Sequence, residues 1–65
     1  MKQMLHLLRG RQVPPALLGE RDWIVDVSGS APRLLPHGCP ALPPGELSFD
    51  ELHRLITIAE LIVTW

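Results

Sequence analysis

The chain has 65 residues, 46% hydrophobic residues, a net charge of -1 and one cysteine. A chain of this length forms at most one small domain with a marginal core, and a single cysteine excludes an intramolecular disulfide as its staple. The apolar fraction and low net charge exclude a disordered chain, and a basic excess typical of nucleic-acid binders is lacking. We therefore expect a single small α+β domain over residues 1–65.

The N-terminal arm, residues 1–9, carries apolar residues that fit one face of a short helix ending at Gly10. We favour this helix because Leu7 and Leu8 are adjacent and interrupt the alternation of a strand. An edge strand is the alternative. The loop of residues 10–22 should contain one helical turn, since Pro15 suits the first position of a helix and Gly19 its end.

Residues 23–35 form the expected strand or hairpin. The segment WIVDVS, residues 23–28, is rich in β-branched and aromatic residues and is followed by Gly29, which is typical of a strand and its turn. Residues 33–35 can return as a short second strand before Pro36. The proline-rich residues 36–46 should form an extended connector, with Ala41 and Leu42 as its contacts to the core.

The strongest local signal is a helix over residues 47–65. Ser48 and Glu51 have the spacing of a capping box, and Leu47 and Leu52 that of a hydrophobic staple. Neither Gly nor Pro interrupts the segment up to Trp65. We expect this helix and the strand to form the core, made of Trp23, Val25, Val27, Leu52, Leu55, Ile56, Ala59, Ile62 and Val63.

The apolar arc of this helix covers about half of its circumference, which is wider than packing on one small sheet requires. A second molecule is therefore expected to cover part of it, either as a homodimer or as a larger protein partner. In a dimer, the last helices would pair antiparallel. The partner-binding residues are predicted to be Ile58, Leu61, Ile62 and Trp65.

No set of residues predicts catalysis or metal binding. His37 and Cys39 have only the distant His6 and His53 as further ligands, and the paired spacing of a zinc site is lacking. The acidic residues Asp22, Asp26, Glu46, Asp50 and Glu51 fit capping and surface positions better than a catalytic pair. A chain this short rarely encloses a pocket of a few hundred cubic ångström. We expect no enzyme activity, cofactor, metal or small-molecule substrate.

Neither a targeting signal nor a membrane span is expected. His6 and Arg9 interrupt the apolar start of the chain before a signal sequence could form. Glu60 interrupts the apolar residues of the last segment, which fall far short of the roughly 20 that a span requires. A lone cysteine fits a reducing compartment. We expect a cytoplasmic protein.

A DNA-binding function is the alternative. Residues 11–14, Arg-Gln-Val-Pro, followed by Leu17, Leu18 and the strand from Trp23, resemble the swapped-hairpin DNA-binding domain of transition-state regulators and antitoxins. The resemblance covers about 17 residues, and Glu20-Arg21-Asp22 replaces the glycine-aspartate turn of that family. It implies a dimeric repressor or antitoxin whose phosphate contacts would be Arg9, Arg11 and Arg21.

The preferred interpretation is a small non-enzymatic accessory or regulatory protein. It would bind a larger protein through its apolar helix face, as a modulator or inhibitor encoded by a phage or another mobile element. Exposed apolar surface on a small chain is typical of a protein contact, and Trp65 is the kind of residue that anchors one.

Overall fold

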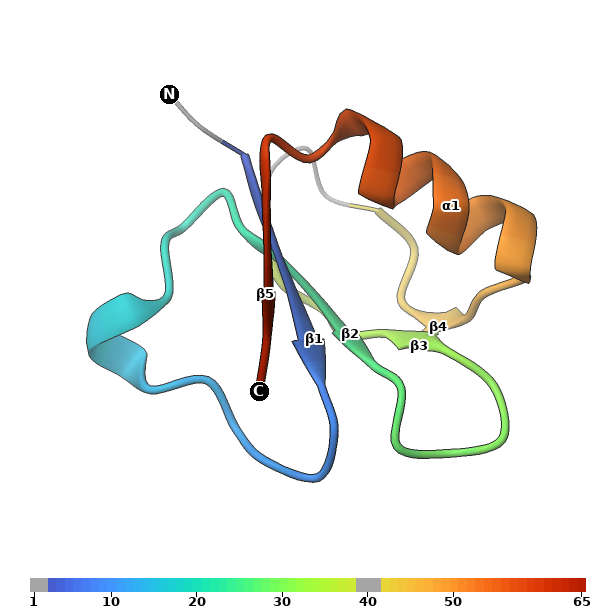
Figure 1. The fold of residues 1–65 in the computed structure, drawn as a ribbon, viewed down its shortest axis with the longest axis horizontal. Helices are drawn as coiled ribbons and strands as arrows, with labels where there is room; N and C mark the ends of the chain where they lie inside the picture. Colours follow the sequence, from blue (N-terminus) through green and yellow to red (C-terminus); the bar gives the residue numbers. More distant parts are fainter. Residues whose placement is uncertain (1–2, 39–41) are drawn as a thin grey trace.

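The structure, a computed structural model, describes residues 3–38 and 42–65. One helix packs on a five-stranded mixed sheet, which confirms the expected small α+β fold (Figure 1). A 3-10 turn lies on the opposite side of the sheet from the helix. In chain order the elements are β1 (Met4–Leu8), η1 (Pro15–Leu17), β2 (Trp23–Asp26), β3 (Arg33–Leu34), β4 (Gly45–Glu46), α1 (Phe49–Ile58) and β5 (Leu61–Thr64).

Strand β1 lies inside the sheet, whose strand order is β4-β3-β2-β1-β5. It pairs in parallel with β2 on one side and with β5 on the other. Leu5 faces the helix, while His6 and Leu8 face the other way, and all three are buried. The expected N-terminal helix is therefore wrong, and so is the edge position of the alternative strand. A parallel strand covered on both faces has a continuous apolar sequence, without the alternation of a half-exposed strand.

The expected hairpin of residues 23–35 is confirmed. Strands β2 and β3 are antiparallel, with Val25 opposite Leu34 and Asp26 opposite Arg33. The proline-rich segment was expected to be an extended connector. Its last two residues form strand β4, which pairs with β3. Leu42 packs against the core as expected, whereas Lys2, Cys39 and Ala41 lie outside the described residues.

The start of α1 follows the sequence prediction. Ser48 is the N-cap, and its hydroxyl accepts a hydrogen bond from the Glu51 N–H at 3.1 Å while the Glu51 carboxylate accepts one from the Ser48 N–H at 3.1 Å. These two bonds satisfy backbone donors that a helix start otherwise leaves unpaired.

No helix of the described residues is long and apolar enough to cross a membrane.

The end of α1 differs from the prediction, because the helix stops at Ile58 and does not continue to residue 65. Ala59 is extended, with φ -65° and ψ 135°. The next N–H group, that of Glu60, donates to the Gln3 carbonyl at 2.8 Å and so begins the pairing with β1. The sequence Leu-Ile-Val-Thr of β5 contains three β-branched residues, which favour a strand. The expected antiparallel pairing of long helices is therefore wrong.

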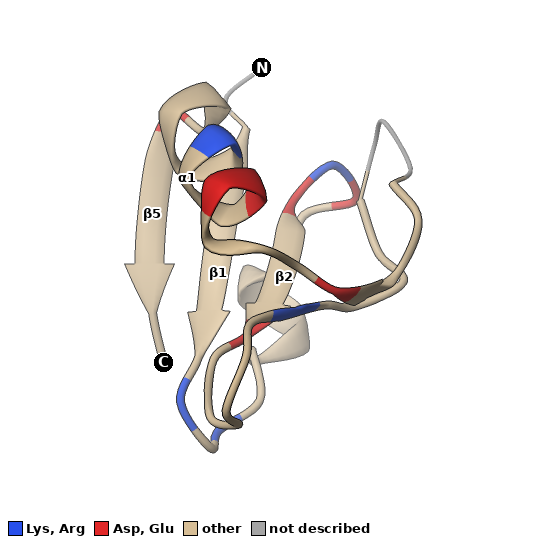
Figure 2. Ribbon diagram, turned by 90° about the vertical axis from the view of Figure 1, so that its right-hand side faces the viewer, with Lys and Arg blue, Asp and Glu red and all other residues tan. Residues whose placement is uncertain are grey.

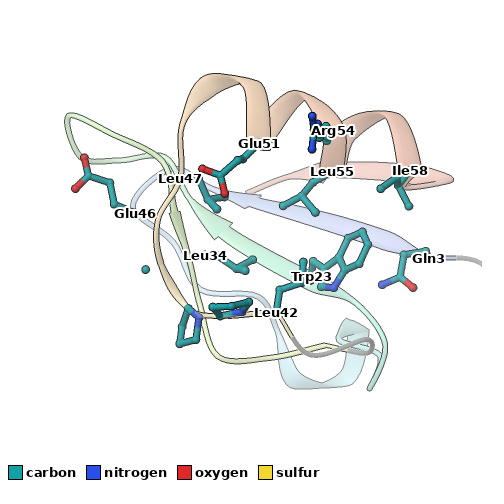
Figure 3. A pocket seen from close by; sticks show the side chains of 13 residues that line it. Gln3, Trp23, Leu34, Leu42, Glu46, Leu47, Glu51, Arg54, Leu55 and Ile58 are labelled. Atoms are coloured by element: carbon teal, nitrogen blue, oxygen red, sulfur yellow. The ribbon is translucent and has the colours of Figure 1, made fainter.

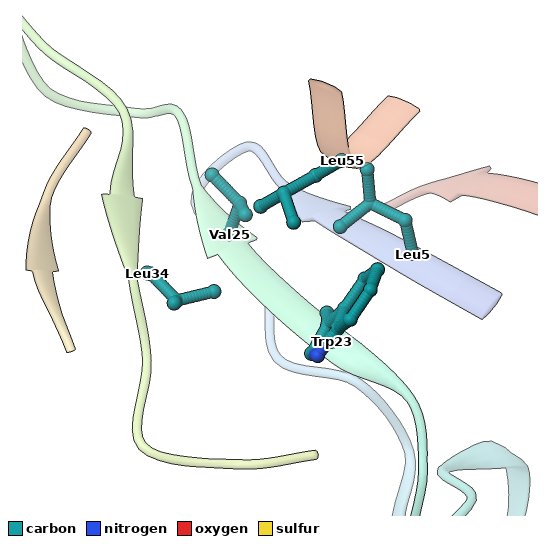
Figure 4. Packing of buried hydrophobic residues seen from close by; sticks show 5 residues of the cluster. All are labelled: Leu5, Trp23, Val25, Leu34 and Leu55. Atoms are coloured by element: carbon teal, nitrogen blue, oxygen red, sulfur yellow. The ribbon is translucent and has the colours of Figure 1, made fainter. Parts of the chain in front are cut away.

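The main core lies between α1 and the sheet. Leu55 is the buried residue of the helix, and it packs on Leu5, Trp23, Val25 and Leu34 from three strands (Figure 4). Of the core predicted from sequence, Trp23, Val25 and Leu55 are buried, whereas Ile62 remains 39% exposed. The helix therefore contributes one buried side chain and the partly buried Leu52 and Ile56, where the sequence predicted a broad apolar face.

The glycine at position 38 should be the least replaceable one in the fold. Its φ is +110°, and a Cβ there would lie 2.6 Å from Trp23 Cδ1 and 2.8 Å from the Asp22 carbonyl oxygen. We expect Gly38→Ala to lower the free energy of unfolding by about 2 kcal/mol or more in a urea titration. The matched control is Gly10→Ala, with φ +89° and open space around its Cβ. It should lower that free energy by about 1 kcal/mol, from backbone strain alone. Equal losses in the two variants would contradict this packing.

Candidate functional site

An open apolar pocket lies between α1 and the sheet, with a volume of about 640 Å³ (Figure 3). Trp23 and Leu34 line it from the sheet, and Leu55 and Ile58 line it from the helix. The remaining lining residues are Gln3, Leu42, Pro43, Pro44, Gly45, Glu46, Leu47, Glu51 and Arg54. The sequence led us to expect that so short a chain would rarely enclose a pocket of a few hundred cubic ångström, and this pocket reaches that size as an open site.

Local sequence explains why this space stays open. Only Leu55 of the ten-residue helix is fully buried, so α1 does not fill the volume above β2 and β3. The segment Leu42-Pro43-Pro44 forms another wall, and its prolines prevent it from becoming a helix or a central strand that could pack into the space. The pocket is therefore framed by residues that cannot easily close over it.

The polar residues of the pocket are mostly engaged by their own chain. The Gln3 amide donates to the Arg21 carbonyl, and Glu51 belongs to the capping box. The hydrogen bond from the Ser48 N–H is the main cause that lowers the pKa of the Glu51 carboxyl. Glu46 lies opposite Arg33 in the β3–β4 ladder. The described lining of the pocket thus offers apolar contact, without a convergent set of polar groups that would orient a polar metabolite.

The structure separates the four predicted partner-binding residues. Ile58 lines the pocket and is 61% exposed. Leu61 and Ile62 are 49% and 39% exposed in β5, the outermost strand on their side of the sheet. Trp65 is half-buried and stacks on His6. The expectation of one helical face carrying all four residues is therefore wrong.

A buried polar cluster joins the ends of the chain on the sheet face opposite α1. His6 is fully buried, and its Nε2 lies 2.8 Å from Asp22 Oδ2. The Trp65 indole N–H donates to His6 Nδ1 at 2.9 Å. Because an indole nitrogen can only donate, Nδ1 is an acceptor and the proton of the neutral ring is on Nε2. Both ring nitrogens are occupied, so this histidine is not placed to act as a general base on a substrate.

The Asp22 carboxylate completes the cluster. Its Oδ2 also accepts the Gly19 N–H at 2.8 Å. Burial raises the pKa of the Asp22 carboxyl, but the hydrogen bonds that the carboxylate accepts from His6 and Gly19 outweigh burial and lower the pKa below 3.8. Asp22 is therefore ionised at neutral pH and holds the end of the loop that precedes β2 against β1.

The other candidate ligands do not converge. His37 Nε2 donates to the Gly19 carbonyl at 2.8 Å, His53 is exposed on α1, and Cys39 lies outside the described residues. Residues 3–38 and 42–65 contain no group of three or more histidine, cysteine or acidic side chains that could hold a metal ion.

The three arginines of the DNA-binding alternative lie at two ends of the sheet. Arg9 and Arg11 follow the end of β1, whereas Arg21 precedes the start of β2. Because β1 and β2 are parallel, these positions are at opposite ends (Figure 2). Residues 11–14 are not a strand, and β2 pairs with β1 of its own chain, unlike the interlaced hairpins of the family that the sequence resembles.

Comparison with protein-family models, with characterised proteins and with solved structures finds no match to this chain.

The cluster of His6, Asp22 and Trp65 was not predicted from the sequence. Asp22 is 16 positions and Trp65 is 59 positions from His6 along the chain. The usable signal was a single histidine inside the apolar run Met-Leu-His-Leu-Leu. A histidine buried in such a strand needs a partner for each ring nitrogen.

The lowered pKa of Asp22 predicts a specific pH dependence. When the pH falls through 3.8, the unfolded carboxyl binds a proton before the folded one does, so acid removes the stability that Asp22 contributes. Asp22→Asn keeps an acceptor oxygen and does not titrate. In denaturant titrations we expect wild type to have the larger free energy of unfolding at pH 6. The difference in this free energy between the two proteins should become smaller as the pH falls below 3.8. Asp26 and Glu51 titrate in both proteins and cancel. A difference in the free energy of unfolding that stays constant with pH would contradict the lowered pKa of Asp22.

Proposed function

We propose that this chain is a non-enzymatic accessory or regulatory protein that binds a larger protein at the apolar pocket beneath α1. The observation that supports the proposal is the pocket itself, about 640 Å³ in volume and walled by Trp23, Leu34, Leu55 and Ile58. Its occupant is an apolar side chain, or two adjacent ones, presented by the partner. Large apolar anchors that enter such a pocket usually supply most of the binding energy of a protein interface.

The lining favours a protein segment over a polar small molecule. The charged residues Glu46, Glu51 and Arg54 are exposed, and the walls between them are apolar. An apolar centre surrounded by polar and charged groups is the ordinary composition of a protein interface. A polar substrate would instead need several polar groups that converge on it.

The place of action and the assembly state complete the proposal. We place the protein in the cytoplasm because its single cysteine fits a reducing compartment. We also propose that it is a homodimer, since a domain of 65 residues without a disulfide usually gains stability from association. The pocket and the dimer contact are separate surfaces, and the dimer contact is argued in the next subsection.

The test compares two exposed apolar residues of the same helix. Ile58 lines the pocket, whereas Phe49 is 75% exposed and does not line it. We expect Ile58→Glu to weaken partner binding about tenfold or more, because it places a charge in the apolar mouth. Phe49→Glu should leave binding within about twofold of wild type. Partner recovery from a cell extract is quantified by mass spectrometry and then by titration of the purified partner, with circular dichroism to check folding.

Equal effects of the two substitutions on partner binding, or an effect of Phe49→Glu alone, would contradict the pocket as the contact.

The DNA-binding alternative predicts a different observation. A duplex bound with an affinity that falls steeply with salt, and lost on replacing Arg9 and Arg11 with glutamine, would replace the proposed function.

A further inference from the structure

Among the described residues, β5 is an edge strand of the sheet, and its outer side can pair with another strand. On its inner side the Trp65 N–H donates to the Leu7 carbonyl at 2.8 Å, and the Trp65 carbonyl accepts the Arg9 N–H at 2.9 Å. Backbone groups of successive strand residues point to opposite sides. The N–H and C=O groups of Ile62 and Thr64 therefore point away from β1. A charged residue or proline that would block an edge is absent from Leu61–Thr64.

The two edges of the sheet differ in this respect. At the other edge, β4 has only two residues and follows two prolines, Pro43 and Pro44, which limits pairing there. At the β5 edge, Leu61 and Ile62 are exposed on opposite faces of the strand. Apolar side chains beside unpaired backbone groups favour the addition of a further strand.

We propose that β5 pairs antiparallel with β5 of a second copy of this chain, with Ile62 of each copy opposite Thr64 of the other. The two sheets then become one continuous sheet with Val63 on the two-fold axis. This register uses all four outward groups of each strand and forms four backbone hydrogen bonds. The inference specifies the contact of the homodimer in the proposed function, and it does not depend on the pocket.

The backbone selects this register over its neighbour. A shift that places Ile62 opposite itself would pair Thr64 with Glu60. The Glu60 N–H already donates to the Gln3 carbonyl at 2.8 Å, on the inner side of the strand. It cannot also donate outward, so the shifted register would lose hydrogen bonds. The register centred on Val63 needs no donor from Glu60.

Side chains are complementary in the same register. Leu61, which is 49% exposed, lies opposite Trp65 of the second copy on one face. A cross-strand aliphatic–aromatic pair stabilises an antiparallel ladder by about 0.2–1 kcal/mol.

Disulfide formation tests the register directly. In a background with Cys39→Ser, Val63→Cys places two thiols across the axis with Cα atoms about 4.5 Å apart, within disulfide range. Ile62→Cys is the matched control, because its two Cα atoms would be on the order of 8 Å apart, too far for a disulfide. We expect the Val63→Cys chain to form a covalent dimer at least about tenfold faster than the Ile62→Cys chain under glutathione oxidation.

Sedimentation equilibrium of the unaltered chain gives a second, independent measurement. A contact of this small size should produce dimers that increase between about 10 µM and about 1 mM protein. Ile62→Lys, which places a charge at the edge, should shift the midpoint of association to at least about tenfold higher concentration.

A monomer over this whole range would overturn the proposal, as would crosslinking that is faster at position 62 than at position 63. Neither result would bear on the pocket, since Phe49→Glu and Ile58→Glu test that surface separately. If Val63→Cys fails to fold, sedimentation of the unaltered chain and of Ile62→Lys decides.

Discussion

The fold depends on one buried imidazole with a different partner on each nitrogen. His6 Nε2 lies against Asp22 and His6 Nδ1 accepts the Trp65 indole N–H, so one side chain links β1, the loop before β2 and the residue after β5. Leaving a buried polar group without its partner costs about 1–3 kcal/mol, a large share of the stability of a chain of 65 residues. A second proton on His6 would also place an N–H against the indole N–H. The cluster therefore requires the neutral ring and fixes its tautomer.

The hydrogen bond between the Trp65 indole and His6 also affects the surface of the protein. Trp65 reaches His6 only if residues 61–65 run parallel to β1, which is incompatible with continuing α1 beyond Ile58. The short helix that results covers Leu5, Val25 and Leu34 through Leu55 but leaves the space that becomes the pocket. The strand that replaces the last helical turns has an outer edge that pairs with no other strand of residues 3–38 and 42–65. The exposed β5 edge thus follows from the position of Trp65, and the short helix contributes to the open pocket.

Local signals were readable from the sequence, and long-range ones were not. The capping box of Ser48 and Glu51 and the β2–β3 hairpin require only neighbouring residues, and both are confirmed. The segment from Leu61 to Thr64 follows directly on the helical pattern, but three of its four residues are β-branched. Its local sequence therefore fits either a helix or a strand, and its pairing with β1 makes it a strand. β1 was misread because burial on both faces removes the alternation of a strand. The pocket arises from the spacing of α1 and the proline segment over the sheet, which local patterns do not encode.

Nuclear magnetic resonance of the His6 ring tests this account most directly. In uniformly nitrogen-15 labelled protein at neutral pH, long-range spectra report which ring nitrogen carries the proton. We expect a single Nε2–H tautomer, with a scalar coupling between Trp65 Nε1 and His6 Nδ1 transmitted through their hydrogen bond. A ring protonated at Nδ1, or a rapidly exchanging average of tautomers without that coupling, would contradict it. In either case the Trp65 side chain would not link the end of β5 to His6.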